Sequence, residues 1–190
     1  YFKAVIQAID QAQEEILVES YIFDYDPIGL RVLHALKRAR DRGVRVQLLI
    51  DAIGSFNWLP QIEGFCKSAS INFKAFHPLP WQKKAFKKFS WRKIRVLLLL
   101  LKKMNRRNHR KFFLIDHQTC FLGSMNISQV HTKEFLGSRA WRDTAVLIVG
   151  ESNQQLRFAF LHAWFTANIK RSFVRGSLSK FKSRNQKLSL

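Results

Sequence analysis

The sequence predicts an α/β fold, and three observations support that prediction. Strand-like stretches rich in β-branched and aromatic residues alternate with helix-like stretches over residues 2–76. Gly and Pro residues stand between several of these stretches and mark turns. The chain has 190 residues, of which 47% are hydrophobic, and this is enough for one domain with a sizeable core. Strands and helices that alternate in this way form a sheet layered with helices.

The first half of the chain supplies the alternation element by element. Apolar side chains recur at helical spacing at its start, and a strand rich in β-branched residues follows. Pro27 and Gly29 then interrupt the pattern, so we expect a turn there. The expected ranges are helix 2–14, strand 15–23, turn 24–29, helix 30–42, strand 44–51, a short helix near 61–69 and strand 71–76.

The second half is less regular. Residues 77–107 break the rhythm, and two apolar strands joined by a short polar turn come after them. A polar segment leads to one more strand and one more amphipathic helix, and the end of the chain is rich in Ser, Lys and Arg. The expected ranges are polar segment 129–141, strand 143–150, helix 152–167 and a linker or solvated end over 169–190.

The positive charge is concentrated in this second half. The formal net charge is +20 and the pI is about 10.7, whereas residues 1–80 hold nine Lys/Arg and nine Asp/Glu. This asymmetry favours an anionic partner, either phosphate, nucleic acid or acidic lipid, over a basic surface that serves solubility alone. Cys66 and Cys120 have no metal-ligand spacing around them, so we expect reduced core residues. No apolar run reaches the roughly 18 residues of a membrane span.

The stretch 108–128, NHRKFFLIDHQTCFLGSMNIS, carries the clearest chemistry. Side chains alternate between the faces of a strand, so His109 and Lys111 share one face and Asp116 falls on the other. We expect the chain to turn back at 117–118. The expected cross-strand pairs are Asp116 with Thr119, Lys111 with Ser124 and His109 with Asn126.

This predicted cluster suits phosphoryl chemistry. Lys111 supplies a fixed positive charge for phosphate oxygens, and Ser124 and Asn126 can donate hydrogen bonds to the same oxygens. His109 can attack phosphorus or move a proton near neutral pH. Gly123 permits a close backbone approach. No carboxylate falls on this face, so a divalent metal would find little to bind.

The same residues resemble the HKD motif of the phospholipase D superfamily. The pattern is His109-x-Lys111-x4-Asp116-x6-Gly123-Ser124-x-Asn126, and its chance occurrence is on the order of 10⁻⁸ per start point. The resemblance covers nearly the whole chain. The stretches YFKAVIQAIDQAQEEILVESYIFDYDPIG, VRVQLLIDAIGS, NRRNHRKFFLID and WRDTAVLIVG are similar to the amino-terminal half of bacterial cardiolipin synthases.

The resemblance implies an architecture. It implies a layered α/β/α sandwich around a mixed sheet, and this sandwich is one lobe of two that pack together and share one site. We expect the lobe to cover residues 1–168, with a basic and aromatic insertion at 78–107. Residues 169–190 would be a basic tail or a linker toward the second lobe.

The resemblance also implies roles for individual residues, without a metal or cofactor. One His attacks the phosphodiester and forms a phosphohistidine, the other protonates the leaving alcohol, and the family's first motif usually supplies the nucleophile. Lys111, Ser124 and Asn126 would bind the phosphate. Asp143, in WRDTAV, matches a family carboxylate that orients the catalytic His. Asp116 matches the acidic residue of the motif, which is structural in the family.

The chain departs from the family pattern because it contains one HKD motif. His131-x-Lys133 comes closest to a second, but no Asp or GSxN follows at the required distances. The second motif would come either from a missing half of the same protein or from a second copy in a homodimer. The chain begins with Tyr1 inside a helix-like stretch, so we expect a domain cut from a longer protein.

The segment 81–107 has no acidic residue and interleaves aromatic residues with Lys and Arg. The leading interpretation is an interfacial segment on anionic lipid, at the cytoplasmic face of the bacterial inner membrane. An apolar helical insertion packed on the core and a groove for nucleic acid are the alternatives. The candidate membrane-contact residues are Trp81, Phe86, Phe89 and Trp91.

Several polar residues keep two interpretations open. Glu19, in an otherwise apolar strand, could face the site or pair with a base. Asp24, Asp26 and Asp51 lie at strand ends, where α/β sites gather, but turn capping would explain them equally well. The histidines other than His109 receive no role.

The leading hypothesis is a phosphatidyltransferase that makes cardiolipin from phosphatidylglycerol. One alternative is a homodimeric, metal-independent endonuclease of the same superfamily, although nucleic acid is the less favoured partner. The other is an inactive lobe that binds anionic membranes.

Overall fold

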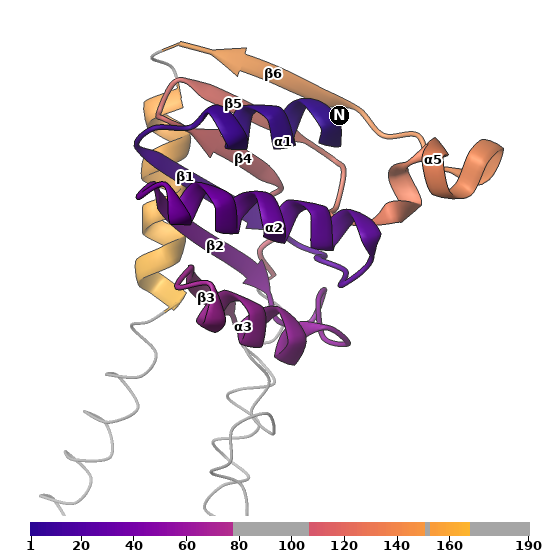
Figure 1. Cartoon of the computed structure of the whole chain (residues 1–190), viewed down its shortest axis with the longest axis horizontal. Coiled ribbons are helices and arrows are strands. Elements are labelled where there is room, and N and C mark those ends of the chain that lie inside the picture. The colour runs from indigo at the N-terminus through magenta and orange to yellow at the C-terminus, as the bar shows by residue number, and fades with distance from the viewer. Residues whose placement is uncertain (78–106, 151–152, 168–190) are drawn as a thin grey trace, which may run out of the picture.

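The computed structural model describes residues 1–77, 107–150 and 153–167, and in it a single mixed sheet carries the fold (Figure 1). The sheet has six strands in the order β3-β2-β1-β4-β5-β6. The first three strands run parallel, and the last three pair antiparallel with their neighbours. The strands are β1 (Glu15–Ser20), β2 (Arg45–Asp51), β3 (Asn72–Phe76), β4 (Phe112–Ile115), β5 (Thr119–Gly123) and β6 (Ala145–Val149).

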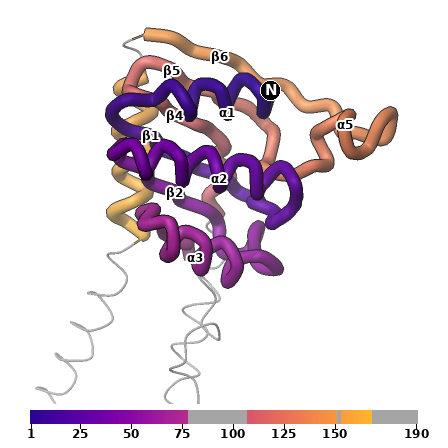
Figure 2. The backbone as a smooth tube through the Cα atoms, viewed as in Figure 1, coloured from indigo at the N-terminus to yellow at the C-terminus, as the bar shows by residue number. Residues whose placement is uncertain are grey.

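Helices cover both faces of this sheet. Helices α1 (Phe2–Gln11), α2 (Pro27–Asp41) and α3 (Leu59–Ser68) lie side by side over one face, and helix 153–167 lies on the other (Figures 1 and 2). Each face has its own apolar core, because side chains of successive strand residues alternate between them. The predicted α/β fold, layered around a mixed sheet, is confirmed.

The predicted turn at 24–29 is wrong in its second half. Helix α2 begins at Pro27, whose fixed φ suits the first turn of a helix. Asp26 caps this helix, since its Oδ1 accepts from the backbone N–H groups of Ile28 and Gly29 at 3.0 and 2.9 Å. A Cβ on Gly29 would lie 1.9 Å from the carbonyl oxygen of Asp24, so glycine permits a close contact inside the helix.

The predicted register of the β4–β5 hairpin is also wrong, by one residue. The structure pairs Ile115 with Thr119, so three residues separate the partners where two were expected. Asp116 and His117 both have positive φ, at 48° and 61°, and Gln118 donates a backbone hydrogen bond to Ile115. A non-glycine residue rarely adopts this left-handed conformation, so the residue types predicted a turn here but not its length. The predicted pairs of Lys111 with Ser124 and His109 with Asn126 are wrong for the same reason, and the Lys111 carbonyl oxygen accepts from the Gly123 N–H instead.

The polar segment that was expected between β5 and β6 forms three short helices. They are η3 (Gln129–His131), α5 (Lys133–Leu136) and η4 (Gly137–Arg139). The loop before them runs beside the end of β1, where Ile127 bridges Phe23. Asp26 ties the two together, because its Oδ2 accepts from the backbone of Gln129 at 2.6 Å.

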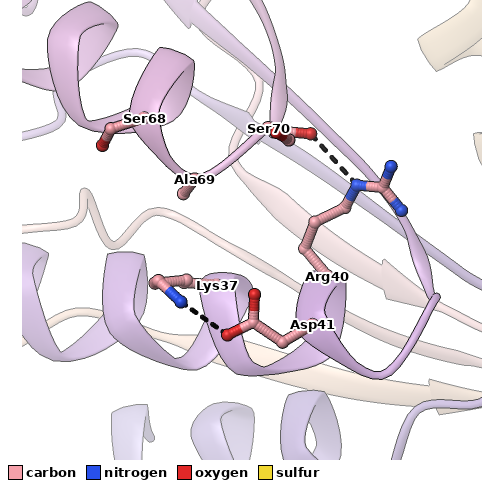
Figure 3. Close-up of a pocket in the computed structure, with 6 residues that line it drawn as sticks. All are labelled: Lys37, Arg40, Asp41, Ser68, Ala69 and Ser70. Atoms are coloured by element: carbon pink, nitrogen blue, oxygen red, sulfur yellow. Dashed lines mark hydrogen bonds and ion pairs between the residues drawn. The ribbon is translucent and has the colours of Figure 1, made fainter.

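A shallow pocket between α2 and the turn after α3 contains no residue of the predicted site (Figure 3). Its wall includes the Lys37–Asp41 ion pair of 2.6 Å and a hydrogen bond from Arg40 to the carbonyl oxygen of Ser70. Among the described residues, no helix is both long and apolar enough to cross a membrane. The proposed membrane-contact residues Trp81, Phe86, Phe89 and Trp91, and the tail 169–190, lie outside the described residues.

Candidate active site

His109 and Lys111 lie together in the segment just before β4. Lys111 Nζ is 3.1 Å from His109 Nδ1 and donates to the His109 carbonyl oxygen at 2.8 Å. His109 itself is exposed to solvent. The alternation of faces that was expected along the strand therefore brings an imidazole and an ammonium into contact.

This contact fixes how the two groups share protons. A charged ammonium can only donate, so His109 Nδ1 then accepts and the imidazole proton lies on Nε2, ready for transfer to a leaving group. When Lys111 is neutral, Nδ1–H can donate to it, and Nε2 is left with a free lone pair for attack. Burial lowers the pKa of Lys111 below its ordinary value, which brings these two arrangements closer in energy.

Lys111 is a buried cation without a directly paired carboxylate. The residue is 6% exposed, and within the part of the chain that the structure describes its hydrogen-bond partners are two atoms of His109. Asp143 acts on it through space and opposes the effect of burial on its pKa. A buried charge with so little compensation favours an anionic ligand, because such a ligand supplies the missing counter-charge.

Tyr21 completes the surroundings of this pair. Its ring centroid lies 4.5 Å from that of His109, and Lys111 Nζ lies 5.5 Å from it. The loop after β2 supports it: Ser55 Oγ donates to the Tyr21 carbonyl oxygen at 3.4 Å, and a Cβ on Gly54 would lie 2.2 Å from that oxygen. Sequence reasoning did not assign Tyr21, although its place just after a parallel strand was a usable signal.

Ser124 and Asp143 form a second contact of the site. Ser124 Oγ donates to Asp143 Oδ1 at 2.8 Å. Gly123, which precedes Ser124, is needed for strand packing, because a Cβ there would lie 2.5 Å from the Thr144 carbonyl oxygen. The close approach expected at Gly123 is therefore made by β6.

Asn126 and the carboxylate of Asp143 contact groups other than His109 among the described residues. Asn126 Oδ1 accepts from the backbone N–H of Ile22 at 3.2 Å. The two oxygens of Asp143 contact Ser124 and His131, and among the described residues His109 Nδ1 contacts Lys111 instead. The structure thus joins His109 to Lys111 and Ser124 to Asp143, as two adjoining groups.

His131 received no role from the sequence, yet it contacts this second group. Its side chain is 2% exposed, and Nδ1 lies 2.9 Å from Asp143 Oδ2. Eleven residues, which include short helices, separate His131 from Asp143, so no strand or helix period could have linked them.

Asp116 lies at the opposite end of β4 from His109. Its carboxylate accepts backbone hydrogen bonds of 2.8, 2.8 and 3.0 Å from Gln13, Glu14 and Glu15. These bonds join the β4–β5 turn to the start of β1.

The opposite face of β4 holds a paired polar cluster. Glu19 is 1% exposed and accepts hydrogen bonds from the Asn108 side chain and from Arg110, whose Nη2 lies 2.9 Å from Oε1. Burial raises the pKa of Glu19, while Arg110 and Asn108 oppose that rise. Glu19 therefore pairs with a base, and Asp51 accepts from the Asn108 backbone at 3.2 Å. Within residues 1–77, 107–150 and 153–167, no three His, Cys, Asp or Glu side chains are grouped to hold a metal ion.

Comparison with known proteins identifies the class to which this fold and site belong. Residues 5–164 match the family described as "Cardiolipin synthase, PLD-like domain", so the chain belongs to the phospholipase D superfamily. The resemblance noted in the sequence is confirmed.

The relatives are cardiolipin synthases. The chain is 34% identical to the cardiolipin synthase of Clostridium perfringens over 167 residues, which are 88% of this chain and 32% of the relative. It is 36% identical to cardiolipin synthase 1 of Staphylococcus aureus over 166 residues, 86% of this chain and 30% of the relative. The chain therefore spans about a third of the length of these relatives.

A solved structure shares the fold. Nuc from Salmonella typhimurium, a phospholipase D family member, superimposes with a TM-score of 0.59 over 85% of each chain. The two sequences are 19% identical, so this likeness concerns the fold alone.

Proposed function

We propose that this chain is one lobe of a phosphatidyltransferase that makes cardiolipin from phosphatidylglycerol. The observation that carries the proposal is the buried Lys111 ammonium, which touches the exposed His109 imidazole and has no paired carboxylate among the described residues. A phosphodiester would place its anionic oxygens against Lys111, with the Ser124 hydroxyl and the Asn126 amide as further donors. The names of the relatives support a lipid phosphodiester.

The reaction proceeds in two balanced steps. His109 Nε2 attacks phosphorus with its lone pair, and the bond from phosphorus to the leaving glycerol oxygen breaks as that oxygen takes a proton from an acid. The acceptor alcohol then attacks phosphorus, gives its proton to the same group, and the phosphorus–nitrogen bond of the phosphohistidine breaks. For this attack the Lys111 ammonium donates to the phosphoryl oxygens in place of His109 Nδ1, so the imidazole proton lies on Nδ1 and Nε2 is free. The ammonium then stabilises the charge on the phosphoryl oxygens in both steps.

The acid would come from a second HKD lobe. The chain carries one HKD histidine, His109, and we assign the acid to the histidine of a second motif. This lobe would belong either to the same longer protein or to a second copy of the chain. The lipid substrate would be reached by peripheral attachment to the cytoplasmic face of the bacterial inner membrane, through the segment 81–107.

The test uses the protein as the cell makes it, mixed with phosphatidylglycerol vesicles in EDTA. We expect cardiolipin and free glycerol to appear, and His109→Ala to abolish both. His162→Ala, which changes an exposed helical histidine, serves as the matched control. Absence of both cardiolipin and phosphatidic acid, or an unchanged rate in His109→Ala, would contradict the proposal.

A homodimeric, metal-independent endonuclease is the second candidate. The fold is similar to that of Nuc over 85% of each chain, and the net charge of +20 suits a polyanion. This candidate predicts a dimer of this chain in solution and cleavage of DNA in EDTA. A monomer that leaves DNA intact excludes it.

A further inference from the structure

His131 contacts two parts of the candidate site, the backbone of Asn126 and the carboxylate of Asp143, which are separated along the chain. Its Nδ1 lies 2.9 Å from Asp143 Oδ2, and its Nε2 accepts a hydrogen bond of 3.3 Å from the backbone N–H of Asn126. The other oxygen of Asp143 accepts from Ser124 at 2.8 Å. One buried ring therefore connects the last residue of the Gly-Ser-x-Asn stretch to the carboxylate that contacts Ser124.

These two contacts define the tautomer of His131. A backbone N–H can only donate, so Nε2 must present its lone pair and carries no proton. The ring proton of the neutral imidazole then lies on Nδ1, where it faces the Asp143 carboxylate. A doubly protonated ring would keep the contact with Asp143 but would lose the acceptor for Asn126.

The surroundings agree with a neutral ring. The side chain is 2% exposed, and burial lowers the pKa of His131, with Asp143 and Asp24 opposing that change. The indole of Trp141 packs edge-on against the ring at a centroid distance of 6.1 Å. Within the described ranges, Asp143, Asp24 and Trp141 are the charged and aromatic groups found to act on or contact His131.

We infer that His131 is a positioning residue of the proposed site: as the Nδ1–H tautomer, it holds Asp143 against Ser124 and fixes the loop that carries Asn126. Asp143 in turn sets the field that acts on Lys111. His131 itself makes no contact with His109 or Lys111 among the contacts of the described residues. The structural part of this inference stands alone, and its catalytic consequence rests on the proposed function.

The first test needs no activity. Long-range ¹H–¹⁵N spectra of the chain labelled with ¹⁵N-histidine, recorded from pH 5 to pH 8, report the tautomer of each ring. The ring whose signals vanish in His131→Asn is expected to show a protonated Nδ1 and a bare Nε2 at pH 7, and its Nδ1 signal should move in Asp143→Asn. An Nε2–H tautomer, or a doubly protonated ring at pH 7, would overturn the inference.

The second test measures transfer from phosphatidylglycerol. In His131→Asn the side-chain amide can replace Nδ1–H as a donor to Asp143, so we expect kcat within a few-fold of the parent. His131→Phe removes the polar Nδ1–H group that lies 2.9 Å from Asp143, and we expect kcat to fall by about 10-fold with little change in KM. His162→Asn is the matched control, and the folded fraction of each variant is verified by its thermal transition.

The two tests separate the inference from the proposed function. If the parent protein transfers no phosphatidyl group, the proposed function fails while the tautomer result still decides the structural part. If the parent is active and His131→Phe matches it in kcat and in pH profile, the positioning role is wrong. Equal losses in the Phe and Asn variants at unchanged fold would also contradict it, because the shared donor to Asp143 would then be irrelevant.

Discussion

Side chains of residues 108–111 lie on two faces of the sheet. The buried charge has a counter-charge on one face and has no paired carboxylate on the other. On one face, Arg110 and Asn108 hold the buried carboxylate of Glu19. On the other, Lys111 and His109 contact each other, and no carboxylate of the described residues pairs with the ammonium. We call the first face closed, because its buried charge has a counter-charge, and the second face open, because its buried positive charge is left for an anion to neutralise.

The largest expected effect is on the open face. His109→Ala should lower phosphatidyl transfer by about 10⁴-fold, because it removes the proposed nucleophile. The free energy of unfolding should change by less than about 0.5 kcal/mol, since His109 is exposed. Activity on vesicles and urea unfolding measure the two quantities. A large loss of stability with retained activity would contradict this assignment, because His109 would then be a structural residue and not a functional one.

Arg110→Ala breaks the closed face. It leaves Glu19 buried with Asn108 as its remaining side-chain partner, and removing one partner of a buried ion pair costs about 3 kcal/mol of unfolding free energy. The pKa of Glu19 is already raised by burial and should rise further. A carboxyl group whose folded pKa lies above its unfolded pKa stabilises the fold at low pH, and that contribution is lost as pH rises through the folded pKa.

The destabilisation in Arg110→Ala should therefore be larger at pH 8 than at pH 5. Urea unfolding at both pH values measures it, and Glu19→Gln combined with Arg110→Ala provides the control, because the amide does not titrate. Equal losses at the two pH values would show that the charge of Glu19 is not the cause.

The motif's own carboxylate belongs with the structural face. Asp116→Ala leaves three backbone N–H groups of the segment 13–15 without their acceptor and places Ala at a φ of 48°. We expect a loss of about 2 kcal/mol in stability, and unchanged kcat for the folded fraction. Asp116→Asn should lose less, since Asn tolerates this φ and keeps one acceptor oxygen. If kcat fell while stability stayed unchanged, Asp116 would have a role in the site and not in the fold.

Lys111→Met should change stability less than Arg110→Ala or Asp116→Ala does, and the sign of this change is what tests the account. It removes a buried charge that lacks a paired carboxylate, so the free energy of unfolding at pH 7 should rise by about 1 kcal/mol while transfer is lost. Because the folded pKa of Lys111 lies below its unfolded value, the parent gains stability as pH rises through the folded pKa. The advantage of the variant should therefore shrink toward pH 10. If Lys111→Met were less stable than the parent at pH 7, the claim that the buried Lys111 charge destabilises the fold would be wrong.

The sequence predicted the layered sheet because periodicity and strand composition are local signals. It also placed His109 and Lys111 together, since alternation along one strand decides that contact. It failed at the hairpin, where Asp116 and His117 adopt a left-handed conformation that neither residue type announces. It failed again at Pro27, because a proline that opens a helix and one that breaks a pattern look alike in sequence.

Contacts through irregular segments could not be predicted. Tyr21 reaches His109 because the loop after β2 supports it, and His131 reaches Asp143 across three short helices. Each contact depends on the tertiary arrangement of loops. The sequence left two interpretations of Glu19, which could face the site or pair with a basic residue. The structure decides between them, because Arg110 lies on the same face and pairs with Glu19.

The most direct measurement of the open face is a titration of the ¹⁵N-histidine-labelled chain with inorganic phosphate in EDTA, followed by NMR. The signals of His109 should shift and saturate, those of the exposed His162 should stay unchanged, and Lys111→Met should abolish the response. A response of His109 that persists unchanged in Lys111→Met would show that the unpaired ammonium does not bind the anion.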